Sequence, residues 1–397
     1  MLDLPNWLFV IPILGSLVLV HEFGHFITAK IFNIKVTEFG FGFPPKIWGY
    51  KKGETTYTIN LIPIGGFVKM VGEEDSTDPR SFAAQSIMKR LIVLAAGPVM
   101  NLLTAIVIFI VLLMIPHETY VGNIVVTNIA PNSPAMNSNL QVGDNIIAIN
   151  NNRISTTAEL IEEVKKNRDT ETELSVQKNL IMGNVTASPE FSHTTTIILT
   201  PRSNPPKLKV VDIVSDSTKE VSYTDAQTYD QNLKIGDTMT QGSLGVIIGL
   251  SNPKIIEEQL PIWKAIPESF GQLSNILTLT FSGLANWSQS GEDPGFTGPI
   301  GIAQITGEVA KIGYNPLFEL TALISISLGI LNLLPIPALD GGRITFILIE
   351  AARGGKRISA KIEGIIHMTG FAVLISLIIL MSYFDLARIL TGGNIIN

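Results

Sequence analysis

Cysteine is absent from the 397 residues of the chain, and this absence excludes thiol nucleophiles, Cys-ligated zinc, iron–sulfur clusters and disulfides. Charged residues are scarce, at 16%, whereas about 25% is typical of soluble domains. A net charge of -6 leaves no basic field, which excludes nucleic acid as a partner. With only five histidines, any metal ion must bind His, Asp or Glu side chains.

Long hydrophobic runs are plentiful by contrast. Crossing a bilayer takes about 20 apolar residues, and four runs reach that length, at about 7–31, 87–115, 317–339 and 365–386. A fifth run, at 262–285, mixes large apolar residues with Lys, Glu, Gln and Asn, which favours an amphipathic helix on the membrane surface. The sequence therefore predicts a protein with four transmembrane helices.

The distribution of Lys and Arg predicts the orientation of these helices. Both residue types concentrate in the segments 33–86 and 343–364. The positive-inside rule places both segments in the cytoplasm, so that both termini and the long insert at 116–260 lie outside. The insert reads as a folded α/β unit, because 122–129 and 142–150 alternate as strands do. Its polar stretch at about 179–235 predicts a mobile insertion.

An HExxH sequence, His21-Glu22-Phe23-Gly24-His25, interrupts the first hydrophobic run. Histidines four residues apart lie on one face of a helix, a spacing that suits two nitrogen ligands of one zinc ion. The intervening glutamate can take a proton from a zinc-bound water. Ionisable groups in hydrocarbon are costly and mark functional sites, although a polar cluster that holds two spans together is the alternative.

Zinc held in this way needs a third protein ligand. His117 and His193 fall in the outer insert, and His367 opens the fourth run, where a place at the membrane interface is expected. Asp340 is the better candidate, because it ends the third run and reaches the same inner side of the membrane as the HExxH sequence. A cap of a helix end in a Gly-rich turn is the alternative for this residue.

The backbone before Asp340 is expected to be irregular. Pro335 and Pro337 break the helix, and irregular backbone at membrane depth is tolerated only in a cavity or inside protein. We therefore expect both prolines to line the substrate cavity. Mn or Co would fit a His, His and Asp site nearly as well as zinc.

Two further segments are candidates for the site. Residues 57–69 predict a cytoplasmic hairpin that dips toward the membrane, whose Gly65, Gly66 and Phe67 would bind substrate by strand addition. A passive surface loop is the alternative. Residues 96–101, with small residues and an asparagine at the start of the second span, favour helix packing, with a place in the active cavity as the alternative.

The chain resembles the site-2 protease family of intramembrane zinc metalloproteases, most closely its bacterial RseP-like members. The resemblance rests on the HExxH sequence, on the motif from Asn332 to Gly341, on the four spans and on an outer domain that resembles the PDZ fold around Gly143 and Asp144. It implies His21, His25 and Asp340 as Zn²⁺ ligands and Glu22 as general base. It also implies that Asn332 holds substrate or polarises its carbonyl.

These patterns together predict an α-helical polytopic membrane protein with a cytoplasmic membrane-associated β-hairpin and an inserted extracytoplasmic PDZ-like α/β domain. The expected parts are a first transmembrane helix (1–32), the β-loop region (33–86), a second helix (87–115), the PDZ-like domain (116–260), interfacial helices and linker (261–316), a third helix (317–342), a cytoplasmic loop (343–364), and a fourth helix with tail (365–397).

The predicted function is intramembrane zinc endopeptidase activity in a bacterial inner membrane, with the active site near the cytoplasmic side. Single-span membrane proteins, such as anti-sigma factors or remnant signal peptides, are the expected substrates, and the PDZ-like domain is expected to bind peptide segments. A transporter or ion pathway built on the His–Glu–His cluster is the alternative, but the two halves of the chain contain no internal repeat. A second alternative is a catalytically silent membrane scaffold, but that function does not explain the HExxH sequence or Asp340.

Overall fold

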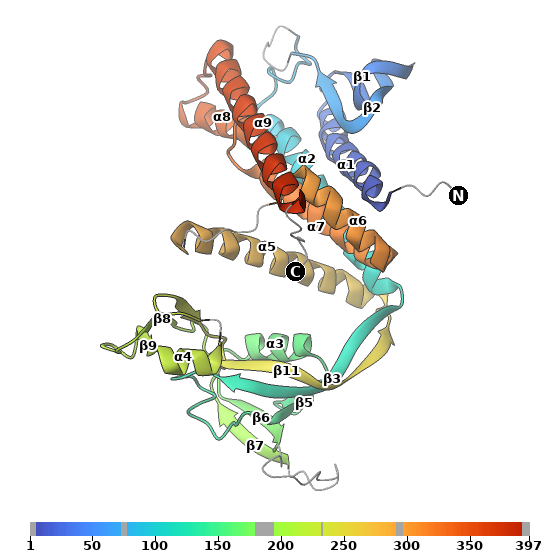
Figure 1. Cartoon of the computed structure of the whole chain (residues 1–397). Helices are drawn as coiled ribbons and strands as arrows, with labels where there is room; N and C mark the ends of the chain where they lie inside the picture. The colour runs from blue at the N-terminus through green and yellow to red at the C-terminus, as the bar shows by residue number, and fades with distance from the viewer. Residues whose placement is uncertain (1–4, 73–77, 179–193, 232, 291–296, 391–397) are drawn as a thin grey trace. The chain divides into compact units, whose positions relative to one another are not determined.

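A computed structural model describes residues 5–72, 78–178, 194–231, 233–290 and 297–390. The chain divides into two compact units (Figure 1). The first comprises Met1–Pro116 and Gln259–Asn397, and the second comprises His117–Glu258. The first unit is mainly helical and the second is mainly strand, so the chain separates its apolar spans from an α/β domain.

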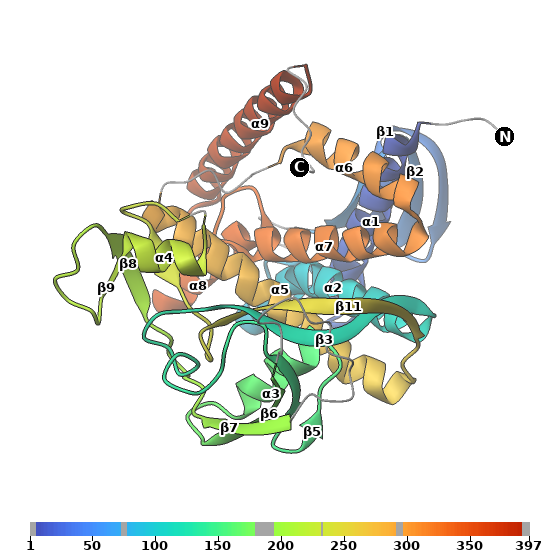
Figure 2. The same cartoon turned by 60° about the horizontal axis from the view of Figure 1, so that its bottom comes forward.

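The helical unit is arranged around α2 (Ile87–Met114). The other helices of this unit are η1 (Asn6–Phe9), α1 (Val10–Ile31), α5 (Ile262–Ser290), α6 (Pro299–Ile312), α7 (Tyr314–Leu333), α8 (Asp340–Ala352) and α9 (Ala360–Leu390). Four of these helices, α1, α5, α7 and α8, pack against α2, and Figure 2 shows α7 lying along it. Their contact with α2 brings residues far apart in the sequence to one place.

Four helices among the described residues are long and apolar enough to span a membrane. They are Asn6–Ile31, Ile87–Met114, Tyr314–Leu333 and Ala360–Leu390. All four coincide with predicted spans. Helix α5, whose composition is mixed, is not one of these four helices.

The end of the third span differs from the prediction. Helix α7 stops at Leu333, and residues 334–339 are irregular, as the two prolines predict. A new helix, α8, then begins at Asp340 and extends into the stretch expected to be a cytoplasmic loop, 343–364. The positive charge that predicts a cytoplasmic side for that stretch comes from Arg343, Arg353, Lys356, Arg357 and Lys361. Helix α8 accommodates the first of them as part of an amphipathic helix.

Glycines allow the helices of this unit to approach closely. A side chain on Gly24 of α1 would collide with the carbonyl oxygen of Ala96 in α2, and one on Gly329 of α7 would come within 3.1 Å of the Pro98 carbonyl oxygen. Contact of backbone with backbone therefore fixes α1 and α7 on α2. Buried apolar side chains complete the contacts, including Leu94 and Val93 between α1, α2 and α8.

Strands β1 (Val36–Lys52) and β2 (Thr55–Met70) form an antiparallel sheet beside α1 (Figure 1). Both strands bend, so that Phe39 of β1 is paired with Val68 on one side and with Tyr57 on the other. The hairpin predicted within 33–86 is therefore present, but the idea that 57–69 forms it alone is wrong. That stretch is a single strand whose partner is β1.

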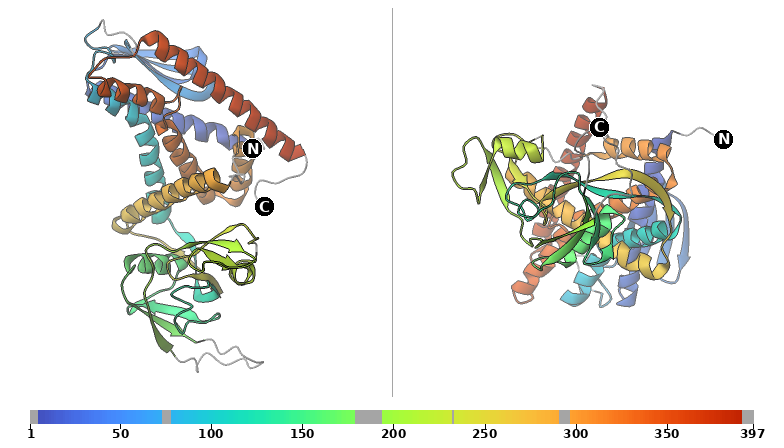
Figure 3. Two further views of the ribbon diagram at one scale, coloured as in Figure 1. Left: turned by 90° about the vertical axis from the view of Figure 1, so that its left-hand side faces the viewer. Right: turned by 90° about the horizontal axis from the view of Figure 1, so that it is seen from below.

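The described residues of the second unit form two sheets, and the unit runs from teal to yellow in Figure 3. The larger sheet has the strand order β11-β3-β4-β6-β7, with β5 paired to β4, and the smaller has the order β10-β8-β9. Strand bounds are β3 (His117–Ile129), β4 (Asn145–Ile149), β5 (Asn152–Arg153), β6 (Thr172–Gln177), β7 (Thr194–Leu199), β8 (Lys207–Val211), β9 (Glu220–Ser222), β10 (Thr238–Thr240) and β11 (Val246–Glu258). Helix α3 (Thr157–Lys166) covers the larger sheet's core and α4 (Tyr223–Tyr229) covers that of the smaller sheet.

The two strands expected from alternation, at 122–129 and 142–150, are present in this unit as β3 and β4. The expected mobile insertion at 179–235 is wrong from residue 194 onward, because β7, β8, β9 and α4 are regular elements there. Its first part, 179–193, lies outside the described residues and includes His193. Buried Val210, Val221 and Met239 hold the smaller sheet together, a core that the polar composition concealed.

Candidate active site

The two histidines of the HExxH sequence lie on one face of α1, turned toward α2. Both are buried, with 7% of His21 and 6% of His25 exposed. Their Nε2 atoms are 3.1 Å apart. The four-residue spacing thus produces the arrangement of nitrogens that the sequence predicts.

Asp340 joins this pair from the first turn of α8. Its Oδ2 lies 2.9 Å from Nε2 of His21 and 3.3 Å from Nε2 of His25. The irregular segment folds back tightly here, and a side chain at Gly341 would collide with the Leu334 carbonyl oxygen. Glycine at this position therefore allows the carboxylate to reach the histidines.

The donor atoms suit a metal ion in chemistry and in spacing. Among the described residues, His21, His25 and Asp340 form a group whose possible ligand atoms all lie within 4.8 Å of one another. Donors of a tetrahedral zinc site, with bonds of about 2.0–2.1 Å, are about 3.3 Å apart. A side chain on Gly97 would come within 2.7 Å of His21 Nε2 and closer still to His25 Nε2. The absence of a side chain at that position leaves both nitrogens accessible.

The ring of His25 is oriented by the backbone of α2. Its Nδ1 lies 2.8 Å from the carbonyl oxygen of Val93. A carbonyl oxygen only accepts hydrogen bonds, so Nδ1 carries the hydrogen and Nε2 keeps its lone pair. Histidines that bind metals are commonly fixed in this way through the other ring nitrogen.

A small cavity of about 270 Å³ opens beside these groups. It is lined by Val18, His21, Glu22, Asn101, Leu328, Asn332, Ala338, Leu339 and Asp340. Four of the five residues for which the sequence predicts a catalytic or ligand role line this cavity, and the fifth, His25, lies against His21 and Asp340. Glu22 is the acid that remains outside the close group of His21, His25 and Asp340.

Strand β2 lies directly beside Glu22. A side chain added at Gly66 would contact Cγ of Glu22 at 3.3 Å. The neighbouring Gly65 has a φ of +93°, a conformation that favours glycine, and Phe67 packs its ring over Gly40 of β1. Of the predicted substrate-binding residues, Gly66 is thus next to the acid.

The two prolines precede the part of their segment that lines the cavity. Neither Pro335 nor Pro337 is among the residues that line the cavity, which are Ala338, Leu339 and Asp340 in this segment. Pro337 instead packs against Gly370 of α9, where a side chain would collide with it.

His367 has a place that the sequence did not suggest. The expectation was a residue at the membrane interface, but its Nδ1 accepts a hydrogen bond from the backbone N–H of Ala338 at 2.9 Å. Ala338 has a φ of +80°, which is strained for a residue with a side chain. His367 therefore helps hold the segment that leads into Asp340, and only the fold brings the two together.

Asn101 also lies at the site, although the sequence favours helix packing for its segment. Its side-chain Nδ2 lies 3.3 Å from Nδ1 of His21, and only 1% of the residue is exposed. The 96–101 segment was a candidate on sequence, with helix packing favoured. The structure supports both uses, because Asn101 also accepts a hydrogen bond from Ser325 of α7 on its backbone oxygen.

Ion pairs near the ends of the spans hold the elements that carry the site. The guanidinium of Arg90 donates to both carboxylate oxygens of Glu350, at 2.9 and 2.6 Å, and lowers the pKa of that carboxyl. Hydrogen bonds from Arg80, and from Lys30 at the end of α1, lower the pKa of Glu54 to about 2. The first pair joins α2 to α8, and the second joins the turn of the β-sheet to α1.

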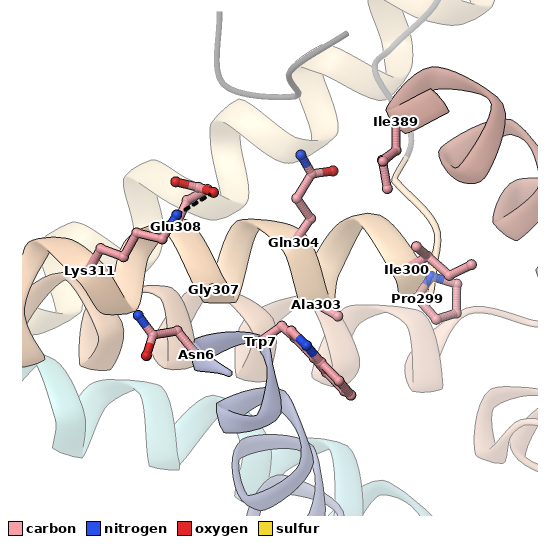
Figure 4. A pocket seen from close by; sticks show the side chains of 10 residues that line it. All are labelled: Asn6, Trp7, Pro299, Ile300, Ala303, Gln304, Gly307, Glu308, Lys311 and Ile389. Carbon is pink, nitrogen blue, oxygen red and sulfur yellow. Dashed lines mark hydrogen bonds and ion pairs between the residues drawn. The ribbon is translucent and has the colours of Figure 1, made fainter. Parts of the chain in front are cut away.

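A larger cavity, of about 580 Å³, lies between η1, α6 and the end of α9 (Figure 4). Trp7, Ile300 and Ile389 give it apolar walls. Its charged lining residues, Glu308 and Lys311, are paired with each other at 2.9 Å. It thus lacks a metal-binding group among its lining residues, and the smaller cavity is the candidate active site.

Comparison with known proteins points to one family. The sequence profile of peptidase family M50 matches residues 9–377. A Clostridium acetobutylicum protein is 32% identical over 383 residues (96% of this chain, 97% of the relative), and one from Clostridium perfringens is 33% identical over 380 (96% and 98%). Both names contain the words zinc metalloprotease. Zinc metalloprotease RasP of Geobacillus kaustophilus is 27% identical over 458 residues (95% and 97%).

Proposed function

The chain belongs to peptidase family M50, the site-2 protease family, and from this premise we propose that it hydrolyses peptide bonds within the membrane-spanning segments of single-span proteins. It is a zinc metalloprotease with apolar helices long enough to span a membrane. The observation that carries the proposal is the meeting of His21, His25 and Asp340 beside Glu22, although 319 residues separate the first histidine from the aspartate.

We assign His21, His25 and Asp340 as the zinc ligands. The support is the 2.9–3.3 Å spacing of their donor atoms, together with the space left by Gly97. When bound, zinc supplies a Lewis acid that polarises a carbonyl and lowers the pKa of water. All three ligands come from backbone segments that are fixed against α2.

Glu22 acts as general base and then as general acid. Its carboxylate takes a proton from the attacking water, whose oxygen bonds to the carbonyl carbon of the substrate. It delivers that proton to the amide nitrogen as the carbon–nitrogen bond breaks. Asn332, from the end of α7, lines the same cavity and donates a hydrogen bond to the oxygen on which negative charge develops.

The edge of β2 at Gly66 presents the substrate. A transmembrane helix satisfies its peptide groups internally, so its peptide bonds become accessible only once it is unwound. Among the described residues, β2 from Gly66 to Met70 pairs with β1 on one side only. An unwound segment that pairs with this edge lies extended next to Glu22. The closeness of Gly66 to Glu22, whose Cγ an added side chain at Gly66 would meet at 3.3 Å, supports this role.

The proposed location is a bacterial inner membrane. The charge distribution favours a cytoplasmic position for the β1–β2 sheet and for α8, and an extracytoplasmic position for the His117–Glu258 unit. We propose that this unit is a PDZ-like domain that binds peptide segments and excludes substrates with bulky outer parts. Substrates are then membrane proteins already trimmed on the outside, such as anti-sigma factors or remnant signal peptides.

The test uses purified protein in detergent or liposomes and a tagged single-span substrate without its outer domain. Wild type should cleave it and hold zinc. The Glu22→Gln variant should keep zinc and lose cleavage, and Asp340→Asn should bind zinc more weakly. Cleavage by Glu22→Gln at the wild-type rate contradicts the assignment of the base. A wild type that neither cleaves nor holds metal contradicts the proposal and favours an ion pathway.

The role of the outer unit needs a separate experiment. Deletion of residues 122–250 should allow cleavage of substrates that keep their outer domains, while cleavage of trimmed substrates continues. Unchanged selectivity after the deletion would show that the unit does not exclude substrates.

A further inference from the structure

Asn101 is the one buried polar side chain of the cavity without a role in the proposed chemistry. It lies on α2, with 1% of its surface exposed, and its amide faces the Nδ1 atom of His21 at 3.3 Å. Its own backbone oxygen is held by the Ser325 hydroxyl at 2.7 Å, which ties this turn of α2 to α7. The amide group is therefore fixed in place behind one of the two histidines.

A neutral imidazole has one N–H and one lone pair. His21 can bind a metal through Nε2 only if the hydrogen is on Nδ1. His25 has this tautomer because the Val93 carbonyl accepts from its Nδ1. For His21, the corresponding group is the amide of Asn101, which offers an acceptor oxygen or a donor NH₂ according to which way it is turned.

The two amide orientations have opposite consequences. With the nitrogen toward His21, Nδ1 must accept, so the hydrogen moves to Nε2, the atom that faces Asp340. In that orientation Asn101 Oδ1 is buried without a hydrogen-bond partner among the described residues. With the oxygen toward His21, Nδ1–H donates to it and the Nε2 lone pair points at His25 and Asp340. A hydrogen bond from Nε2 of His21 to Asp340 fits the first orientation, whereas binding of a metal ion through Nε2 requires the second, with the Asn101 oxygen toward His21.

We infer that Asn101 is a positioning residue. Its amide oxygen accepts the Nδ1–H of His21 and holds that ring in the tautomer whose Nε2 binds the metal. It does for His21 what the Val93 carbonyl does for His25. Both supports come from α2, so this helix orients the two histidines of α1. The inference rests on the proposed role of His21 as a ligand.

The test compares Asn101→Leu and Asn101→Asp in the full-length protein in detergent. Leucine has a similar size and no acceptor, whereas aspartate keeps an oxygen that only accepts. Zinc affinity is measured by competition with a chelator, and the geometry of the site by the visible spectrum of the cobalt-loaded protein. Spectra of ¹⁵N-labelled histidine report the tautomer of His21. We expect Asn101→Leu to weaken zinc binding by about 10–100-fold, and Asn101→Asp to stay within a few-fold of wild type.

Ser325→Ala is the matched control, because it removes the hydrogen bond to the Asn101 backbone and leaves the amide facing His21. It should change zinc affinity by less than a few-fold. Wild-type affinity and cobalt spectrum in Asn101→Leu would overturn the inference. So would an equal loss in Asn101→Asp and Asn101→Leu, since that pattern reports packing alone. If Asn101→Leu does not fold, Asn101→Asp decides, and a tenfold loss there overturns the inference.

Failure of the ligand assignment has a different signature. His21→Ala would then bind zinc as tightly as wild type, whatever the Asn101 variants do. If His21→Ala loses zinc and Asn101→Leu does not, the proposed ligands stand and the positioning role fails.

Discussion

Gly97→Ala should remove zinc from the active site while leaving the metal-free protein folded. The new Cβ would lie 2.7 Å from Nε2 of His21 and closer still to Nε2 of His25, whereas van der Waals contact takes about 3.5 Å. Each ring must therefore retreat by roughly 0.8 Å or more. Ligand distances in a metal site tolerate only about 0.2 Å. Both proposed nitrogen ligands would be lost from their positions at once.

The size of the effect follows from the atoms that move. Changes behind a metal ligand typically cost 10–100-fold in affinity, and here the ligands themselves are displaced. We expect zinc affinity to fall by more than about 100-fold, or about 2.8 kcal/mol. The helix itself should not suffer, because alanine favours an α-helix over glycine by about 1 kcal/mol and the three nearest atoms to the new Cβ all belong to the two imidazoles.

Zinc is counted by elemental analysis after gel filtration in detergent, and folding is followed by thermal unfolding in chelator. Gly271→Ala is the control, since it places the same methyl group on α5 with nothing within 4 Å. It should keep full zinc. A Gly97→Ala protein that also holds one zinc per chain with wild-type affinity would refute the proposed ligand geometry.

Two further predictions concern stability. The pKa of Glu54 is lowered to about 2 by hydrogen bonds from Arg80 and Lys30, so its contribution is complete above its ordinary pKa near 4.5 and is lost as the pH falls toward 2. Glu54→Gln should lower the free energy of unfolding by about 0.5–1 kcal/mol, because the pair is partly exposed. In thermal unfolding, the difference from wild type should shrink between pH 5 and 3. A difference that grows as the pH falls would contradict the assignment. Glu350→Leu should lower the free energy of unfolding by about 3–5 kcal/mol, because it leaves Arg90 buried and unpaired. The double variant with Arg90→Met should recover part of this loss of stability. An equal loss in the single and the double variant would show that the pair does not contribute to stability.

Local patterns were sufficient for the parts of the site that lie within one helix or one turn. The four-residue spacing of His21 and His25 puts both nitrogens on one face of any helix, and the prolines before Asp340 break any helix. The four spans follow from length and hydropathy in the same way. Such features depend on neighbours in the sequence, so no knowledge of the fold is needed.

The features that sequence did not predict depend on distant contacts. Helix α8 extends into a stretch for which the sequence predicts only a connection between spans, because its pairing with α2 through Glu350 and Arg90 is invisible in the sequence. Strand β1 contains Gly and Pro residues that discourage a strand, and it is stabilised by pairing on both sides with β2. His367 is in the same class, since only the fold brings it to the backbone of Ala338.

The wide separation of the proposed ligands along the chain has a consequence for synthesis. His21 and Glu22 leave the ribosome near the beginning of translation, but Asp340 follows 319 residues after His21. At about 5–20 residues per second, tens of seconds pass between the two events. During that time the nascent chain carries the proposed general base, Glu22, without the complete set of proposed ligands. On this assignment the protease becomes active only when most of its own polypeptide is made, so an unfinished chain would not cleave neighbouring membrane proteins.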